Sequence, residues 1–137
     1  MKIAFLRGSL IHIDPDTETT LLLMYECYRR GHQVFFLEPH DLYVRESKVV
    51  GRMHEIVPGP SLDLRAYWQA AINCVENDKL VFEDVCELDA LFLRKNPPLL
   101  HDVVELLSSV EDQVFMVNSL SGQVLGNSKL YTLNFPD

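Results

Sequence analysis

A strand, a helix and a second strand follow one another within the first 40 residues, and this order limits the fold more than any other feature. Residues 2–6 form a largely apolar run, which is typical of a strand that is buried on both faces. Residues 14–17 (Asp-Pro-Asp-Thr) are predicted to begin a helix that ends at Gly31, and the apolar run 34–37 follows at once. A crossover this short favours parallel, right-handed pairing of the two strands, with the helix packed on one face of the sheet.

The rest of the chain continues this pattern. Two further apolar runs, 90–93 and 114–117, are predicted strands, and residues 99–110 between them carry a helical apolar stripe. The other predicted elements are a β-hairpin near residues 41–57, a helix over 61–74 and short helical turns at 121–125 and 128–133, while the acidic segment 77–87 is assigned only weakly. We therefore expect one α/β domain over residues 1–137, with an open, mainly parallel, Rossmann-like sheet of about four strands and helices on both faces.

Charge and cysteine content narrow the classes of partner and compartment. The chain has 20 acidic and 12 basic residues and a formal charge of −8, so it repels phosphate backbones and anionic lipids on average. We therefore expect neither nucleic acid nor a membrane as a partner. The three cysteines lack C-x-x-C spacing, which indicates reduced thiols. The sequence also contains no signal peptide pattern, and we expect a cytoplasmic protein.

In an open parallel sheet, ligands bind beyond the carboxyl ends of the strands. The residues at the ends of the four predicted strands are Arg7-Gly8-Ser9, Glu38-Pro39-His40, Arg94-Lys95-Asn96 and Asn118-Ser119. Neither G-x-G-x-x-G nor G-x-x-x-x-G-K-[ST] occurs in the sequence, so it has no standard phosphate-binding loop. Ser9 and His12 have no evident orienting carboxylate, and the five histidines lack metal-ligand spacing. We expect no catalytic residue and no metal site.

Arg94 and Lys95 are the most unusual of these strand-end residues. Both follow a buried strand, and the two prolines after Asn96 fix how the chain leaves the sheet. The planar guanidinium of Arg94 suits a carboxylate or a phosphate, which makes it a natural clamp for an anionic substrate. The alternative is a surface pair of cations before a helix that starts with proline, and the residues alone leave both interpretations open.

Three motifs, in the same order and spacing, resemble a known family. They are Leu93-Arg94-Lys95-Asn96-Pro97-Pro98, the pair Val117-Asn118 followed by Asn127-Ser128-Lys129-Leu130, and Phe135-Pro136-Asp137, and residues 1–43 add Tyr28-Arg29-Arg30-Gly31-His32 and Asp41-Leu42-Tyr43. Over nearly its whole length the chain thus resembles the N-terminal domain of bacterial glutathione synthetase, an ATP-grasp ligase. The resemblance implies a pre-ATP-grasp domain that lines one side of the site for γ-glutamylcysteine.

The resemblance also implies roles for particular residues. Arg94 matches the family's substrate-contacting arginine, and Lys129 matches the lysine that reaches the nucleotide phosphates. Ser9 and Asn96 stand at the same rim and are further candidates for substrate binding. The rim departs from the family, which has methionine-aspartate-proline-isoleucine at residues 7–10 and aspartate at Asn96. The resemblance therefore leaves open whether the substrate is γ-glutamylcysteine or another small acidic peptide or amino acid.

For the full-length ligase the resemblance implies ATP and magnesium, held by ATP-grasp domains that would begin where this chain stops, at Asp137. We expect this domain alone to bind neither. Its expected partners are an ATP-grasp domain, on the same or a separate chain, and the small acidic substrate, and a homo-oligomer is left open. Two hypotheses follow: the chain is the substrate-binding domain of a glutathione synthetase-like ATP-dependent ligase, incomplete as a catalyst alone, or it is a stand-alone binding or assembly module that kept the fold and lost the chemistry.

Overall fold

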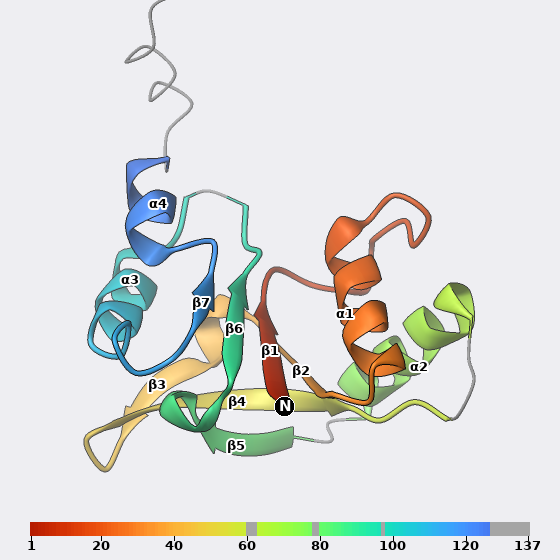
Figure 1. Ribbon diagram of the computed structural model, residues 1–137, viewed down its shortest axis with the longest axis horizontal. Coiled ribbons are helices and arrows are strands. Elements are labelled where there is room, and N and C mark those ends of the chain that lie inside the picture. Colours follow the sequence, from red (N-terminus) through yellow and green to blue (C-terminus); the bar gives the residue numbers. More distant parts are fainter. Residues whose placement is uncertain (60–62, 78–79, 97, 127–137) are drawn as a thin grey trace, which may run out of the picture.

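The computed structural model describes residues 1–59, 63–77, 80–96 and 98–126, in which one sheet lies between helices (Figure 1). The helices are α1 (Thr19–Arg29), α2 (Leu64–Glu76), α3 (His101–Ser108) and α4 (Leu120–Leu125), and the 3-10 turns are η1 (Pro39–Asp41) and η2 (Val85–Glu87). The strands are β1 (Lys2–Leu6), β2 (Gln33–Leu37), β3 (Leu42–Arg45), β4 (Lys48–Ile56), β5 (Leu80–Asp84), β6 (Ala90–Leu93) and β7 (Met116–Val117).

The sheet has a parallel part and an antiparallel part. The order of strands is β3-β4-β2-β1-β6-β7, and β5, which lies off this path, pairs with β4. The strands β2, β1, β6 and β7 are parallel to one another, whereas β4 is antiparallel to β2, β3 and β5. The four parallel strands are those predicted from the apolar runs. The sheet is larger than the expected four strands because the predicted hairpin and β5 join it as well.

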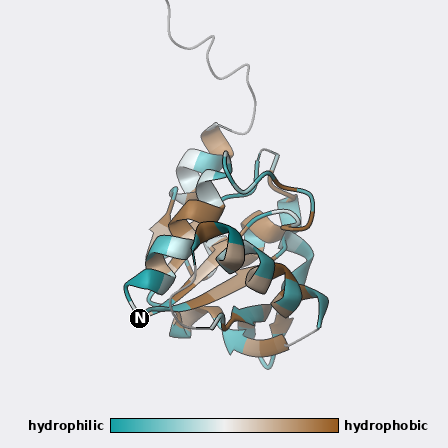
Figure 2. Ribbon diagram, turned by 90° about the vertical axis from the view of Figure 1, so that its right-hand side faces the viewer, coloured by the Kyte–Doolittle hydropathy of each residue, from teal (hydrophilic) through white to brown (hydrophobic). Residues whose placement is uncertain are grey.

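Alternate residues of the central strands enter two separate cores. Ala4 and Leu6 of β1 face the side of α3 and α4, whereas Ile3 and Phe5 face the side of α1 and α2. Both faces are covered because every residue from 3 to 6 is apolar and buried. Figure 2 shows the side with α1 and α2, where hydrophobic strands lie behind helices of mixed hydropathy. The prediction of helices on both faces is confirmed.

The helix α1 ends where the sequence predicts but begins later. At its C-terminus the N–H of Gly31, with φ of 77°, donates to the carbonyl of Tyr28 at 2.9 Å, which ends the helix. The predicted start at residues 14–17 is wrong. There the Asp14 carboxylate accepts hydrogen bonds from the N–H of Asp16 and from the Thr17 hydroxyl, so these residues form their own turn. Glu18 caps the helix instead, accepting from the N–H of Thr20 at 3.1 Å.

The predicted hairpin is confirmed as β3 and β4, which turn at Glu46 and Ser47, both with positive φ. The strand β5, within the weakly assigned segment 77–87, was not predicted. The predicted helical turn at 121–125 is part of α4, whereas the one at 128–133 lies outside the described residues. In the described part of the chain, every helix is too short or too polar to cross a membrane.

Candidate functional site

A polar cleft lies at the carboxyl ends of the parallel strands. It has a volume of about 380 Å³, and its walls come from the ends of β1 and β6, from Asn118 after β7, and from the first residues of α1 and part of α4. The polar side chains of the lining include those of Arg7, Glu18, Thr19, Arg94, Asn96 and Gln123. The topology of the sheet therefore brings strand-end residues from distant parts of the sequence to one place.

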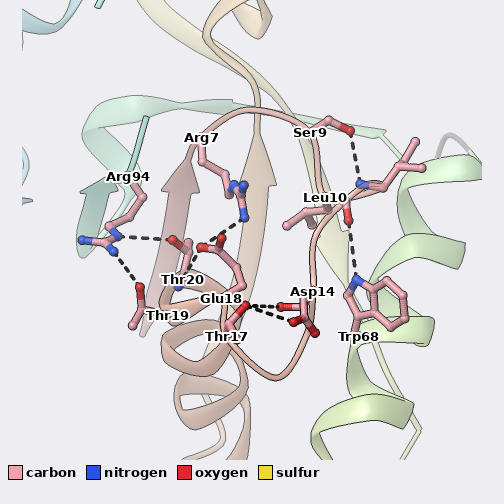
Figure 3. A network of polar contacts seen from close by, with 11 residues as sticks. Arg7, Ser9, Leu10, Asp14, Thr17, Glu18, Thr19, Thr20, Trp68 and Arg94 are labelled. Atoms are coloured by element: carbon pink, nitrogen blue, oxygen red, sulfur yellow. Dashed lines mark hydrogen bonds and ion pairs between the residues drawn. The ribbon is translucent and has the colours of Figure 1, made fainter. Parts of the chain in front are cut away.

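Arg94 reaches this cleft because the parallel ladder continues one residue past β6. Its N–H donates to the carbonyl of Leu6 at 2.8 Å, which fixes the backbone at the rim. Its guanidinium then points toward the start of α1, where Nε donates to the Thr20 hydroxyl at 3.3 Å and Nη2 donates to the Thr19 hydroxyl at 3.2 Å (Figure 3). Among the described residues, no carboxylate oxygen lies within 4.0 Å of this guanidinium.

Arg7 enters the same cleft from the end of β1 but is arranged differently. Its Nη1 lies 3.3 Å from Oε1 of Glu18, and only 14% of its side chain is exposed. The same oxygen of Glu18 accepts the N–H of Thr20. Figure 3 shows Glu18 and Thr20 lying between the two arginines. Glu18 thus caps α1 and balances the charge of Arg7 at once.

The Glu18 carboxylate is ionised in this setting. Partial burial raises the pKa of Glu18. Hydrogen bonds from the side chain and backbone of Thr20 and the charges of Arg7 and Arg94 lower it, and together they outweigh burial, so the pKa of Glu18 lies below its usual value. The lining also includes Lys95. Among the described residues, the cleft lining therefore carries three cations and one carboxylate in a chain whose formal charge is −8, so the cleft is locally positive in an acidic protein.

The structure brings together some of the residues that the sequence suggested. Arg94 and Asn96 both line the cleft. Ser9 lies on the loop after β1 and is absent from the lining; its hydroxyl accepts the N–H of Ile11 at 3.2 Å, which closes a local turn. Lys129 lies outside the described residues. The binding roles of these four residues stay predictions.

Several lining residues were not predicted from the sequence, among them Glu18, Thr19 and Thr20. The reason for these three is the wrong start of the first helix, which placed them inside it rather than at its N-terminus. An acidic residue followed by two threonines, directly before an apolar helical stripe, was the available signal. Asn118 was noted only as a strand end; its side-chain amide donates to the carbonyl of Leu93 at 2.9 Å and ties the ends of β7 and β6 together.

Comparison with known proteins identifies the family. Residues 1–122 match the family described as "Prokaryotic glutathione synthetase, N-terminal domain". The glutathione synthetase of Synechocystis sp. is 29% identical over 98% of this chain and 43% of its own length. That of Coxiella burnetii is 30% identical over 99% of this chain and 41% of its own length. That of Synechococcus elongatus is 30% identical over 98% of this chain and 43% of its own length.

The match extends over most of the present chain but over a smaller share of each relative. The chain spans about two fifths of the length of these curated relatives. The matched residues include β1 to β7 and the cleft residues Arg7, Glu18 and Arg94. The chain therefore belongs to the family of prokaryotic glutathione synthetase N-terminal domains.

Proposed function

We propose that this chain is the substrate-binding N-terminal domain of a glutathione synthetase-like ATP-dependent ligase and that it does not complete the reaction alone. The ligand of the cleft is the carboxylate of a small acidic peptide, with γ-glutamylcysteine as the first candidate. The rest of the catalytic machinery belongs to an ATP-grasp domain, on the same or a separate chain.

The observation that carries this proposal is the pairing of Arg94. Among the described residues, its guanidinium donates its side-chain hydrogen bonds only to hydroxyl groups of α1. The charge of Glu18 also acts on it, but Glu18 forms its ion pair with Arg7. A cation that is partly removed from water and has no carboxylate of its own attracts an anionic ligand, and an arginine binds a carboxylate through charge-assisted hydrogen bonds. The amides of Asn96 and Gln123 in the same lining can bind the polar backbone of a peptide.

Magnesium does not suit the described cleft. Magnesium prefers carboxylate and water oxygens, and the one carboxylate of the described lining, that of Glu18, is already held by Arg7 and Thr20. We therefore assign ATP and magnesium to the remainder of a longer ligase and derive no step of this chain through them. ATP hydrolysis by the purified chain alone would contradict this assignment.

A stand-alone binding or assembly module is the second candidate function. The ion pair between Arg7 and Glu18 favours it, because this pair compensates one of the cations of the cleft internally. The two candidates differ in their ligand, since a module that lost the chemistry has no need to recognise γ-glutamylcysteine.

The test is a titration of the chain with γ-glutamylcysteine, followed by calorimetry and by ¹H–¹⁵N NMR spectra. We expect saturable binding with shifts at residues around the cleft. Arg94→Gln should weaken this binding at least about tenfold, since it removes a charge-assisted interaction. Arg45→Gln is the matched control, because Arg45 is exposed at the end of β3 and lies outside the cleft lining. Equal affinities of Arg94→Gln and Arg45→Gln would overturn the proposal.

A further inference from the structure

The two threonines at the start of α1 occupy one particular edge of the Arg94 guanidinium. Nε and Nη2 lie on the same side of the planar group, and these two atoms donate to Thr20 and Thr19 at 3.3 Å and 3.2 Å. A carboxylate often binds arginine through this edge, with two parallel hydrogen bonds. Because the hydroxyls already fill it, a ligand must approach the other edge, which consists of Nη1 and the second hydrogen of Nη2.

The hydroxyls of Thr19 and Thr20 differ in whether they can form a further hydrogen bond. Thr20 is 2% exposed, and its hydroxyl accepts a hydrogen bond from Arg94. Burial raises the pKa of the Glu18 carboxyl, but the hydrogen bond from the Thr20 side chain helps to lower that pKa below its usual value. The bonding capacity of the Thr20 hydroxyl is therefore used inside the protein. Thr19 is exposed and lines the cleft. Its hydroxyl accepts from Arg94, and no acceptor for its own hydrogen is present among the described residues.

We propose that Thr19 is a specificity-determining residue of the cleft, which donates its hydroxyl hydrogen to the same ligand carboxylate that Arg94 binds end-on. The reason is the direction of its existing bond: the Thr19 hydroxyl accepts from the guanidinium, so its hydrogen stays available for a carboxylate, which can only accept. One carboxylate oxygen then lies between the Thr19 hydroxyl and Nη2, and the other meets Nη1. Thr20 is a positioning residue that holds the guanidinium for this contact. The inference rests on the proposed function, in which Arg94 binds the carboxylate.

The test compares Thr19→Val and Thr19→Ser in titrations of the whole chain with γ-glutamylcysteine. Valine keeps the shape and removes the hydroxyl, and we expect roughly tenfold weaker binding, the effect of one hydrogen bond to a charged group. Serine keeps the hydroxyl and should bind within about twofold of the unaltered chain, since the donor is retained. Thr17→Val is the matched control: Thr17 precedes the same helix, contacts Asp14 and lies outside this cleft, so its affinity should not change.

The positioning role of Thr20 has its own readout, the Nε–H signal of Arg94 in ¹H–¹⁵N NMR spectra. In the unaltered chain this hydrogen is bonded to the Thr20 hydroxyl, so the signal should be observable and slow to exchange with water. Thr20→Val should shift it and speed its exchange without ligand present, whereas Thr19→Val should leave it in place. A Nε–H signal unchanged in Thr20→Val would contradict the positioning role.

The outcomes separate this inference from the proposed function. If Arg94→Gln weakens binding and Thr19→Val does not, or if Thr17→Val weakens it as much, the role of Thr19 is wrong and the proposed function stands. If Arg94→Gln leaves the affinity unchanged, or the unaltered chain shows no saturable binding, the proposed function fails and this inference fails with it.

Discussion

The two parts of the sheet use their charged side chains in different ways. In the antiparallel part, the described cations pair with carboxylates: Nη2 of Arg52 lies 2.7 Å from Asp41, and Nζ of Lys48 lies 2.8 Å from Asp84. At the cleft, which lies at the ends of the parallel strands, Arg94 has two hydroxyl groups instead. Ion pairs therefore hold strands and turns together in the antiparallel part, whereas the positive charge of Arg94 at the cleft stays available for a ligand.

This difference has a physical consequence for stability and for binding. Removing one partner of a buried ion pair destabilises the fold, because the other charge is left away from water without compensation. A cation held by neutral hydroxyls keeps its net charge, and an anionic ligand gains from meeting it. Loss of the buried Asp41 carboxylate in the antiparallel part should therefore lower stability, and loss of the Arg94 guanidinium at the cleft should lower affinity.

The largest effect on stability is expected for Asp41→Ala. Asp41 is 5% exposed, and its carboxylate accepts from Nε and Nη2 of Arg52 and from the N–H of Glu38. Removing it should lower the free energy of unfolding by about 2–3 kcal/mol, because several donors lose a charged acceptor. Urea unfolding followed by circular dichroism measures this. Arg94→Gln should cost less than about 1 kcal/mol in the same assay, and the reverse order of the two variants would refute the comparison.

A smaller effect, dependent on pH, is expected at the border of the cleft for Glu18→Gln. The pKa of Glu18 is lowered from 4.5 in the folded protein, since hydrogen bonds from Thr20 and the charge of Arg7 outweigh its burial. Its contribution to stability is therefore complete above the pKa of the unfolded chain and disappears as the pH falls through the lower, folded pKa.

The measurement is urea unfolding of both proteins at pH 7 and at several values below 4.5. Glu18→Gln should be less stable by under about 1 kcal/mol at pH 7, because the side chain is partly exposed. The difference should narrow as the pH falls. If the difference in unfolding free energy between the unaltered chain and Glu18→Gln stays constant down to pH values near 3, the Glu18 charge does not stabilise the fold.

The smallest effect is expected for Lys48→Gln. The hydrogen bond and charge of Lys48 hold the pKa of Asp84 below its usual value, but this pair lies at the surface, where solvent screens it. We expect an unchanged midpoint of urea unfolding and a rise in the pKa of Asp84, measured by NMR of its carboxyl carbon during an acid titration. An unchanged pKa of Asp84 would show that the pair does not form in solution.

The structure agrees best with the sequence-based predictions where one local signal decides it. The apolar runs at 2–6, 34–37 and 90–93 are strands of the parallel part, since an uninterrupted apolar run is stable only when both faces are covered. Gly31 ends α1 because its positive φ is easily adopted by glycine. The strand β5 was missed because its apolar run is only three residues long and is followed by two acidic residues.

The candidate site was predicted only in part, because only some of its residues are marked by a local signal in the sequence. Arg94 and Asn96 follow a buried strand directly, so their place at the rim could be inferred from topology. Thr19 and Thr20 could not be found in this way. Their role depends on a guanidinium that is 74 residues or more away in the sequence, and on a helix that begins at Thr19 because the Asp14 carboxylate closes an earlier turn.

By itself, the sequence determined the class of fold, the parallel strands and the strand ends that face the cleft, because these follow from local hydrophobic patterns and from the handedness of short crossovers. Only the tertiary structure decided which charges pair. Arg7 meets Glu18 whereas Arg94 meets two hydroxyls, and this choice depends on distances between groups far apart in the chain. Electrostatic interactions weaken with distance and with solvent, so the sequence supplies the charges and the fold decides which of them stay available for a ligand.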